Sequence, residues 1–154
     1  RQIDGPLPPK PPHASRDGDP RHVRLSPDNE AAERDYHVRT GHFPTMHLLA
    51  LRRTLAEAHP CLPRALYEGF VAARDVALDR LRSIWLGNAN RLSLPWLNAS
   101  MERTIATLGA DYWSYGFKAN RAELDAVCRY SVEQHLACMR VTPEDLFCSA
   151  MRET

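Results

Sequence analysis

The sequence lacks an excess of charge and a long apolar run, and each absence excludes a class of partner. Its 154 residues carry 20 Lys and Arg against 19 Asp and Glu, a formal net charge of +1. So balanced a charge provides no general attraction to nucleic acid or to an anionic membrane surface. No stretch of about 18 apolar residues, the length that crosses a bilayer, is present. We therefore expect no nucleic acid and no membrane among the partners of this chain.

Motifs for metals, phosphates and nucleophilic catalysis are missing as well. None of the four cysteines stands in a Cys-x-x-Cys pair, and there is no Gly-rich phosphate loop and no Gly-x-Ser-x-Gly nucleophile elbow. His37, His42 and His47 recur every five residues, which scatters ligands around a helix and alternates them on a strand. The sequence therefore predicts no metal and no cofactor, and it favours a solvated position for His37.

The cysteines and the N-terminus bear on the compartment. Scattered cysteines in a protein of this size favour buried, reduced thiols, which indicates a reducing compartment. The N-terminus lacks the charged and then apolar layout of a secretory signal. We expect a cytoplasmic protein. Because the sequence does not begin with Met, a signal peptide on a longer reading frame, and with it a periplasmic location, stays an alternative.

The first 27 residues differ from the rest in their proline content. Seven prolines exclude a regular helix or a central strand before Ser26. Such a segment is usually a linker or a tail, but it is neither Gly/Ser-rich nor a charged low-complexity stretch. We therefore predict a Pro-rich extended arm or crossover segment over residues 1–27, followed by a mainly helical domain over residues 28–154.

Capping residues and apolar spacing predict four or five helices in that domain. Ser26-Pro27-Asp28 is typical of a helix start, with Ser26 as the N-cap, and Gly41 is typical of a helix end. Three further helices begin near Leu94, at Asn120 and at Thr142. The longest helix lies between Pro63 and Gly87, with Arg74 and Arg82 in solvent. Its predicted core-facing stripe is Leu66, Phe70, Ala73, Ala77, Leu81 and Ile84.

Residues 40–53 hold the most suggestive turn. Gly41 and Pro44 constrain the backbone where histidines and Phe43 precede an apolar run. Met46–Leu55 fits a helix or a short buried strand equally well. His47 stands where the turn meets that run, so it suits either an acid–base role or a buried hydrogen bond. Arg52 or Arg53 could clamp a carboxylate, although a surface pair is an equal alternative.

A second candidate is the aromatic stretch from Asp111 to Phe117, between two predicted helices. Aromatic side chains on a loop can line a pocket for an aromatic ligand, and Tyr115 and Trp113 add polar donors. Packing in a core is the alternative reading of the same residues.

Three stretches of the sequence together resemble the C-terminal half of the 4,5-dihydroxyphthalate decarboxylase family. They are YHVRTGHFPTMHLLALRR at 36–53, HPCLPRALYEGF at 59–70, and a third stretch from LPWL at 94–97 through DYWSYGFKANRAELDAVCRYSVEQHL to TPEDLF at 142–147. The resemblance implies an α/β fold, the C-terminal part of a two-lobed type II periplasmic-binding-protein-like architecture. This part would be mainly helical with one or two short strands, including a strand over residues 46–52.

The implied activity is the non-oxidative decarboxylation of 4,5-dihydroxyphthalate to 3,4-dihydroxybenzoate and CO2, in aromatic catabolism. His47 would serve as acid–base or phenol-binding residue and Arg52 as carboxylate partner. The candidate substrate-binding residues are Thr40, Thr45, Trp113 and Tyr115.

The implied partners are a small aromatic carboxylate and either a missing N-terminal half or a second copy. Alternatives that stay open are a solute-binding protein of an ABC transporter and a non-catalytic fragment.

Overall fold

The structure of the chain is a computed structural model that describes residues 13, 18–21, 23–24, 26–44, 47–87 and 91–154. The predicted arm over residues 1–27 therefore lies mostly outside the described residues, and the division at residue 27 stays a prediction. The described elements are α2 Asn29–Thr40, α3 Arg53–Ala58, α4 Leu62–Trp85, α5 Leu97–Leu108, α6 Arg121–Glu133, α7 Pro143–Leu146 and the 3-10 helix η1 Ser149–Met151.

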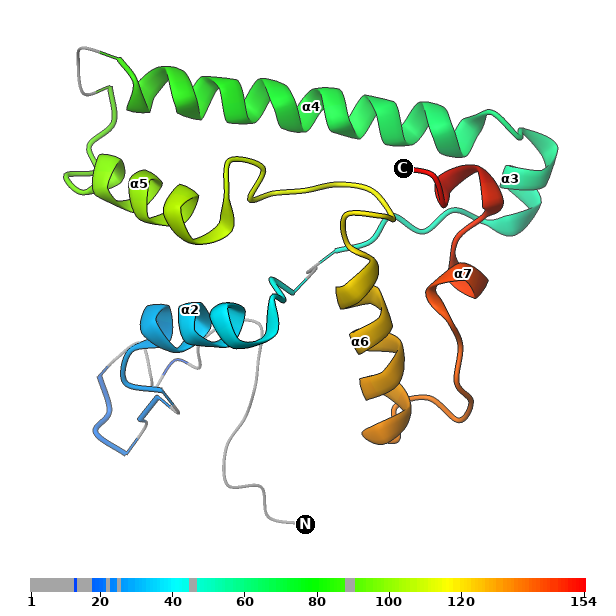
Figure 1. Cartoon of the computed structure of the whole chain (residues 1–154), viewed down its shortest axis with the longest axis horizontal. Helices are drawn as coiled ribbons and strands as arrows, with labels where there is room; N and C mark the ends of the chain where they lie inside the picture. The colour runs from blue at the N-terminus through cyan, green and yellow to red at the C-terminus, as the bar shows by residue number, and fades with distance from the viewer. Residues whose placement is uncertain (1–12, 14–17, 22, 25, 45–46, 88–90) are drawn as a thin grey trace.

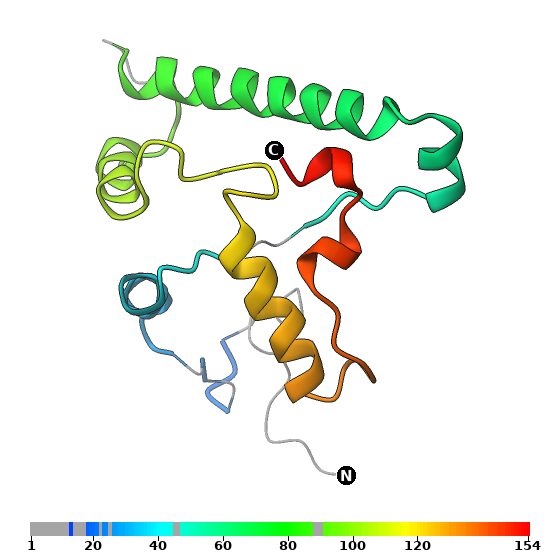
Figure 2. The same cartoon turned by 45° about the vertical axis from the view of Figure 1, so that its right-hand side comes forward.

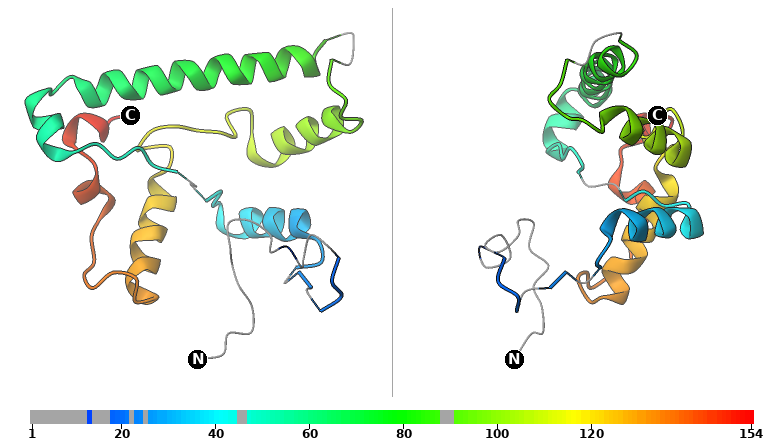
Figure 3. Two further views of the ribbon diagram at one scale, coloured as in Figure 1. Left: turned by 180° about the vertical axis from the view of Figure 1, so that it is seen from behind. Right: turned by 90° about the vertical axis from the view of Figure 1, so that its left-hand side faces the viewer.

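The longest helix, α4, lies along one edge of the molecule, and the other described helices lie to one side of it (Figure 1). From the end of α4 the chain turns back into α5, and the segment that follows α5 runs back along α4 before α6 begins (Figure 2). Helix α6 then runs away from α4, and the chain returns through α7 and η1 to the underside of α4 (Figure 3). No helix among the described residues is long and apolar enough to span a membrane.

The predicted α/β class is wrong for the part of the chain that the structure describes, because those residues form helices and no strand. The strand expected over residues 46–52 is the clearest case. Residues 47–51 make no backbone hydrogen bond to another described segment. A strand is stable only beside a partner whose N–H and C=O groups it can pair with, and Leu48 and Leu49 are each 61% exposed rather than buried in a sheet.

One predicted helix start differs from the observed cap, and another agrees with it in position. Helix α2 begins after Asp28, whose carboxylate accepts a hydrogen bond from the Ala31 N–H at 3.0 Å. Ser26, the predicted N-cap, instead donates its hydroxyl to the Asp28 carbonyl oxygen. The end of α2 is as predicted, since Gly41 has a left-handed backbone with φ of 71°. Asn120 occupies the N-cap position of α6, but its side chain donates a hydrogen bond to the Gly116 carbonyl oxygen and not to the helix end.

Helix α4 buries only part of the face that its apolar spacing predicts, since Leu66, Leu81 and Ile84 are partly buried. Phe70 is 49% exposed, and Ala73 and Ala77 are exposed too. Arg74, predicted to lie in solvent, has a side chain only 15% exposed. The packed face therefore includes Arg74, and much of the predicted apolar stripe lacks a partner among the described residues.

The buried apolar core is small and lies around α5, α6 and α7. It comprises Met101, Phe117, Leu124, Ala126 and Cys128, with Pro143 fully buried beside them. The Phe117 and Phe147 rings meet edge to face with centroids 5.2 Å apart.

The four cysteines differ in burial, and the buried one belongs to this core. The expectation of buried cysteines holds for Cys128 alone, because Cys61, Cys138 and Cys148 are exposed. Burial raises the pKa of the Cys128 thiol.

Candidate functional site

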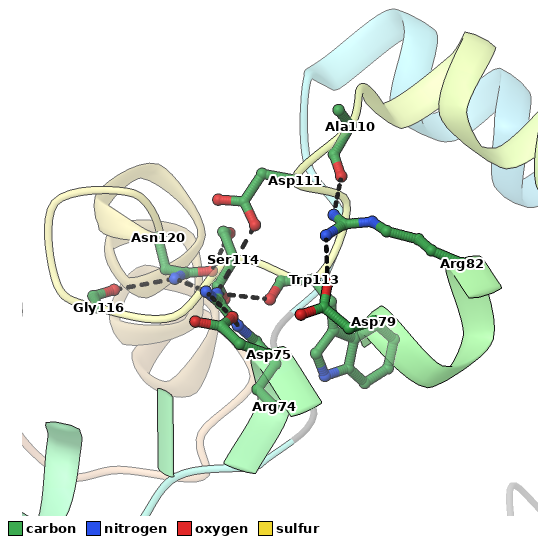
Figure 4. Close-up of polar contacts among 10 residues, drawn as sticks. All are labelled: Arg74, Asp75, Asp79, Arg82, Ala110, Asp111, Trp113, Ser114, Gly116 and Asn120. Atoms are coloured by element: carbon green, nitrogen blue, oxygen red, sulfur yellow. Dashed lines mark hydrogen bonds and ion pairs between the residues drawn. The ribbon is translucent and has the colours of Figure 1, made fainter. Parts of the chain in front are cut away.

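The clearest concentration of aromatic and polar groups is the aromatic loop, residues 109–120, which joins α5 to α6 and runs alongside α4 (Figure 4). Two glycines with positive φ allow the loop its path, Gly109 at 85° and Gly116 at 107°. Beyond Gly116, the N–H groups of Phe117 and Lys118 donate to Thr154 at 3.1 and 2.7 Å. The loop is therefore attached at its far end to the last described residue.

Arg74 of α4 holds the middle of the aromatic loop. Its Nη1 donates to the Trp113 carbonyl oxygen at 3.2 Å, and its guanidinium carbon lies 5.1 Å from the centroid of the Tyr115 ring. Asp75 accepts from Nε and Nη2 at 3.0 and 2.8 Å, while an oxygen of Asp111 lies 3.6 Å from Nη1. A guanidinium so largely removed from water is compensated here by two carboxylates, a carbonyl and a ring face.

Arg82, two turns further along α4, holds the start of the loop less tightly. Its Nη2 donates to the Ala110 carbonyl oxygen at 3.4 Å and its Nη1 to Asp79 at 3.3 Å. The Arg82 side chain is 43% exposed, so solvent competes with these contacts.

Asn120 closes the loop from its other end. Its Nδ2 donates to the carbonyl oxygens of Ser114 and Gly116 at 3.3 and 2.9 Å, and its Oδ1 lies 3.5 Å from the Ser114 hydroxyl (Figure 4). An amide that ties two carbonyls of one turn fixes the turn's shape. The sequence predicts a helix start at Asn120, and the side chain of Asn120 stabilises the loop instead of the helix end.

The turn after α2 reaches the same loop. The rings of Phe43 and Trp113 meet edge to face with centroids 6.2 Å apart, and the Phe43 N–H donates to a Glu123 carboxylate oxygen at 3.3 Å. The His42 carbonyl oxygen lies 3.2 Å from His37 Nδ1, while His42 Nδ1 is buried without a hydrogen-bond partner. Two segments that the sequence singled out separately are thus in contact.

This arrangement leaves aromatic surface open to a ring-shaped ligand. Phe43 and Trp113 are 42% and 45% exposed, so aromatic surface remains open for a ring to lie against. Tyr115 brings a phenol beside a fixed positive charge. No group of three or more His, Cys, Asp or Glu side chains within the described ranges is arranged to hold a metal ion.

The other predicted site residues are not joined to this loop. His47 and Arg52 are exposed, and no hydrogen bond or ion pair between described residues links either of them to residues 109–120. Thr40 is exposed and donates its hydroxyl to the Tyr36 carbonyl oxygen at 2.7 Å. Thr45 lies outside the described residues.

Arg74 is the residue that sequence reasoning missed. It was assigned to solvent because it lies off the stripe that runs through Phe70 and Ala73. A second set of residues at helical spacing, Val71, Arg74 and Leu78, is present in the sequence and is partly buried as well. An arginine within an apolar stripe is the signal that would have found it.

Comparison with known proteins confirms the family resemblance. No family model matches the chain. Over 153 residues the chain is 34% identical to a 4,5-dihydroxyphthalate decarboxylase from Comamonas testosteroni, a match that covers 99% of the chain and 46% of that protein. The chain thus spans about half the length of this relative.

Proposed function

We propose that the protein takes part in the non-oxidative decarboxylation of a dihydroxylated aromatic dicarboxylate, 4,5-dihydroxyphthalate, giving 3,4-dihydroxybenzoate and CO2. The observation that carries the proposal is 34% identity, over nearly the whole chain, to a protein named for that reaction. The aromatic loop supports it as well, since the partly exposed rings of Phe43 and Trp113 offer a surface against which an aromatic ring can stack. No cofactor is included in the proposal.

The reaction needs three things from its site. The carbon–carbon bond to one carboxylate breaks, its electron pair stays on the ring carbon, and that carbon takes up one proton as CO2 leaves. An acid must deliver the proton. A cation must hold the carboxylate that is retained, and hydrogen bonds to the phenols must stabilise charge that moves into the ring.

The aromatic loop and the turn supply candidates for substrate binding. Trp113 and Tyr115 would contact the ring and its phenols, since one is half exposed and the other carries a hydroxyl beside Arg74. Thr40 and Thr45, which flank Phe43 in the sequence, would add hydroxyl groups.

His47 and Arg52 are the candidates for the chemistry itself. We assign proton transfer to His47 and the retained carboxylate to Arg52. Both side chains are exposed on the segment that leads into α3, so a substrate can reach them. Imidazole titrates near neutral pH, and a guanidinium matches a carboxylate through two parallel hydrogen bonds.

We further propose that a covering partner completes the site, either the remaining part of a longer chain or a second copy. The support is the match to only 46% of the relative together with exposed apolar residues such as Leu48, Leu49 and Phe70. A cytoplasmic location is part of the same proposal and is checked by cell fractionation.

The test is CO2 release from 4,5-dihydroxyphthalate by the 154-residue chain and by the complete product of its reading frame. We expect release from the complete protein, and a large loss of kcat in His47→Gln but not in His59→Gln. His59 is a matched control, because it is exposed at the other end of α3. No release, together with a ligand-dependent rise in melting temperature, would instead indicate a binding protein.

A further inference from the structure

Arg74 contacts the aromatic loop in more ways than are needed to neutralise its positive charge. Asp75, its neighbour in sequence, already accepts two of its hydrogen bonds. The remaining contacts go to the loop: the Trp113 carbonyl oxygen, the face of Tyr115 and the more distant Asp111. An arginine that only balanced charge on α4 would have no need of a carbonyl oxygen and a ring from another segment.

The geometry of a guanidinium explains why these contacts fix orientation. The group is planar and its donors point in set directions. A hydrogen bond to the Trp113 carbonyl sets the backbone from which the indole projects, and stacking over Tyr115 sets the plane of the phenol ring two residues later. With a side chain only 15% exposed, Arg74 has little freedom to move away from either.

We propose that Arg74 is a positioning residue that fixes how Trp113 and Tyr115 present their rings to an aromatic substrate. The proposal rests on the proposed function, because it concerns the ring-binding part of the same site. Arg74 does not itself bind the substrate's carboxylate, since its donors are directed to Asp75 and Trp113. Arg74→Lys should therefore fail to replace it, although the positive charge is kept.

The first experiment measures the environment of Trp113 in the aromatic loop, without any substrate. In a protein with Trp85→Phe and Trp96→Phe, Trp113 is the remaining tryptophan and reports on the loop by its emission maximum and by acrylamide quenching. We expect Arg74→Lys and Arg74→Met to shift the emission to the red and to increase quenching, at unchanged helical circular dichroism. Arg80→Met is the control, since Arg80 is exposed on the same helix.

The second experiment uses 4,5-dihydroxyphthalate and the complete product of the reading frame. Both Arg74 variants should raise KM roughly tenfold, with a smaller change in kcat, as expected for a misplaced binding group. Arg80→Met should change neither constant.

The outcomes separate this inference from the proposed function. Unchanged Trp113 emission in Arg74→Met, or unchanged KM in a wild-type protein that does release CO2, would overturn the role of Arg74. If the wild-type protein releases no CO2, the proposed function fails, and the fluorescence still decides whether Arg74 holds the loop.

Discussion

At the scale of single residues, Gly116 has the least room for change. Its φ is 107°, and a Cβ placed on it would lie 2.8 Å from the carbonyl carbon of Thr154 and 3.2 Å from the Tyr67 hydroxyl. Both the backbone conformation and the space therefore require glycine. This one position lets the loop turn toward α6 while the last described residue lies against it.

Gly116→Ala should accordingly destabilise the fold. We expect a loss of about 1–3 kcal/mol in the free energy of unfolding from the backbone conformation, with the contact to Thr154 adding to it. The measurement is urea unfolding followed by circular dichroism. Gly69→Ala is the control: Gly69 lies within α4 with open space around it, so alanine should stabilise by about 0.5–1 kcal/mol. Equal stability of Gly116→Ala and wild type would contradict this account.

Single residues also show which features of the fold can be predicted from the sequence. Gly41 was correctly predicted as a helix end, because helix termination by glycine depends on a few neighbouring residues. Arg74 was not predicted, because its burial depends on Trp113 and Tyr115, which lie about forty positions away in sequence and come close only in the fold. Features that depend on neighbouring residues, such as helix ends, can be predicted from a sequence, whereas contacts between distant segments cannot.

At the scale of elements, the helices were easier to predict than the extended segment before α3. The α4 and α5 patterns contain enough apolar repeats to indicate a helix on their own. Residues 47–52 were assigned to a strand through the family resemblance, and a strand depends on partners that the described residues do not supply. Helix α7, only four residues long, depends on its capping residues.

The capping box of α7 predicts a dependence on pH. The Thr142 N–H and hydroxyl both donate to Asp145 Oδ2 at 2.8 Å, and these hydrogen bonds, the backbone one first, lower the pKa of the Asp145 carboxyl. The unfolded chain takes up this proton at the ordinary pKa of about 3.9, before the folded chain does. The stabilisation is therefore complete above that pH and is lost as the pH falls through the lower, folded value.

Asp145→Asn should consequently lower the urea midpoint at pH 7, and the difference from wild type should shrink at acid pH. The measurement is a series of unfolding curves from pH 7 down to the lowest pH at which both proteins fold. Glu102→Gln removes an equal charge from an exposed position on α5 and serves as the control. A difference between Asp145→Asn and wild type that stays constant across the series would show that the carboxylate does not stabilise α7.

At the scale of the whole molecule, the described structure leaves much apolar surface in water. Among the described residues, Leu48 and Leu49 are each 61% exposed, Leu86 is 69% exposed and Trp96 is 76% exposed. On α4, Phe70 and Val76 are 49% and 52% exposed, and Ala73 and Ala77 of the predicted stripe are exposed as well. Leu66, Leu81 and Ile84 of that stripe are partly buried, so the described residues cover the predicted apolar face only in part.

That surface predicts how the 154-residue chain behaves alone. We expect it to self-associate through the exposed face of α4, because a contiguous apolar patch of this kind is rarely left in water. Light scattering coupled to size exclusion should then give a mass above 17.5 kDa that rises with concentration. Phe70→Glu combined with Val76→Glu should restore the monomer mass, while Val38→Glu, an isolated exposed valine on α2, should not. A monomer at every concentration would mean that the open face of α4 is tolerated in water, and the proposal of a covering partner would lose its main physical support.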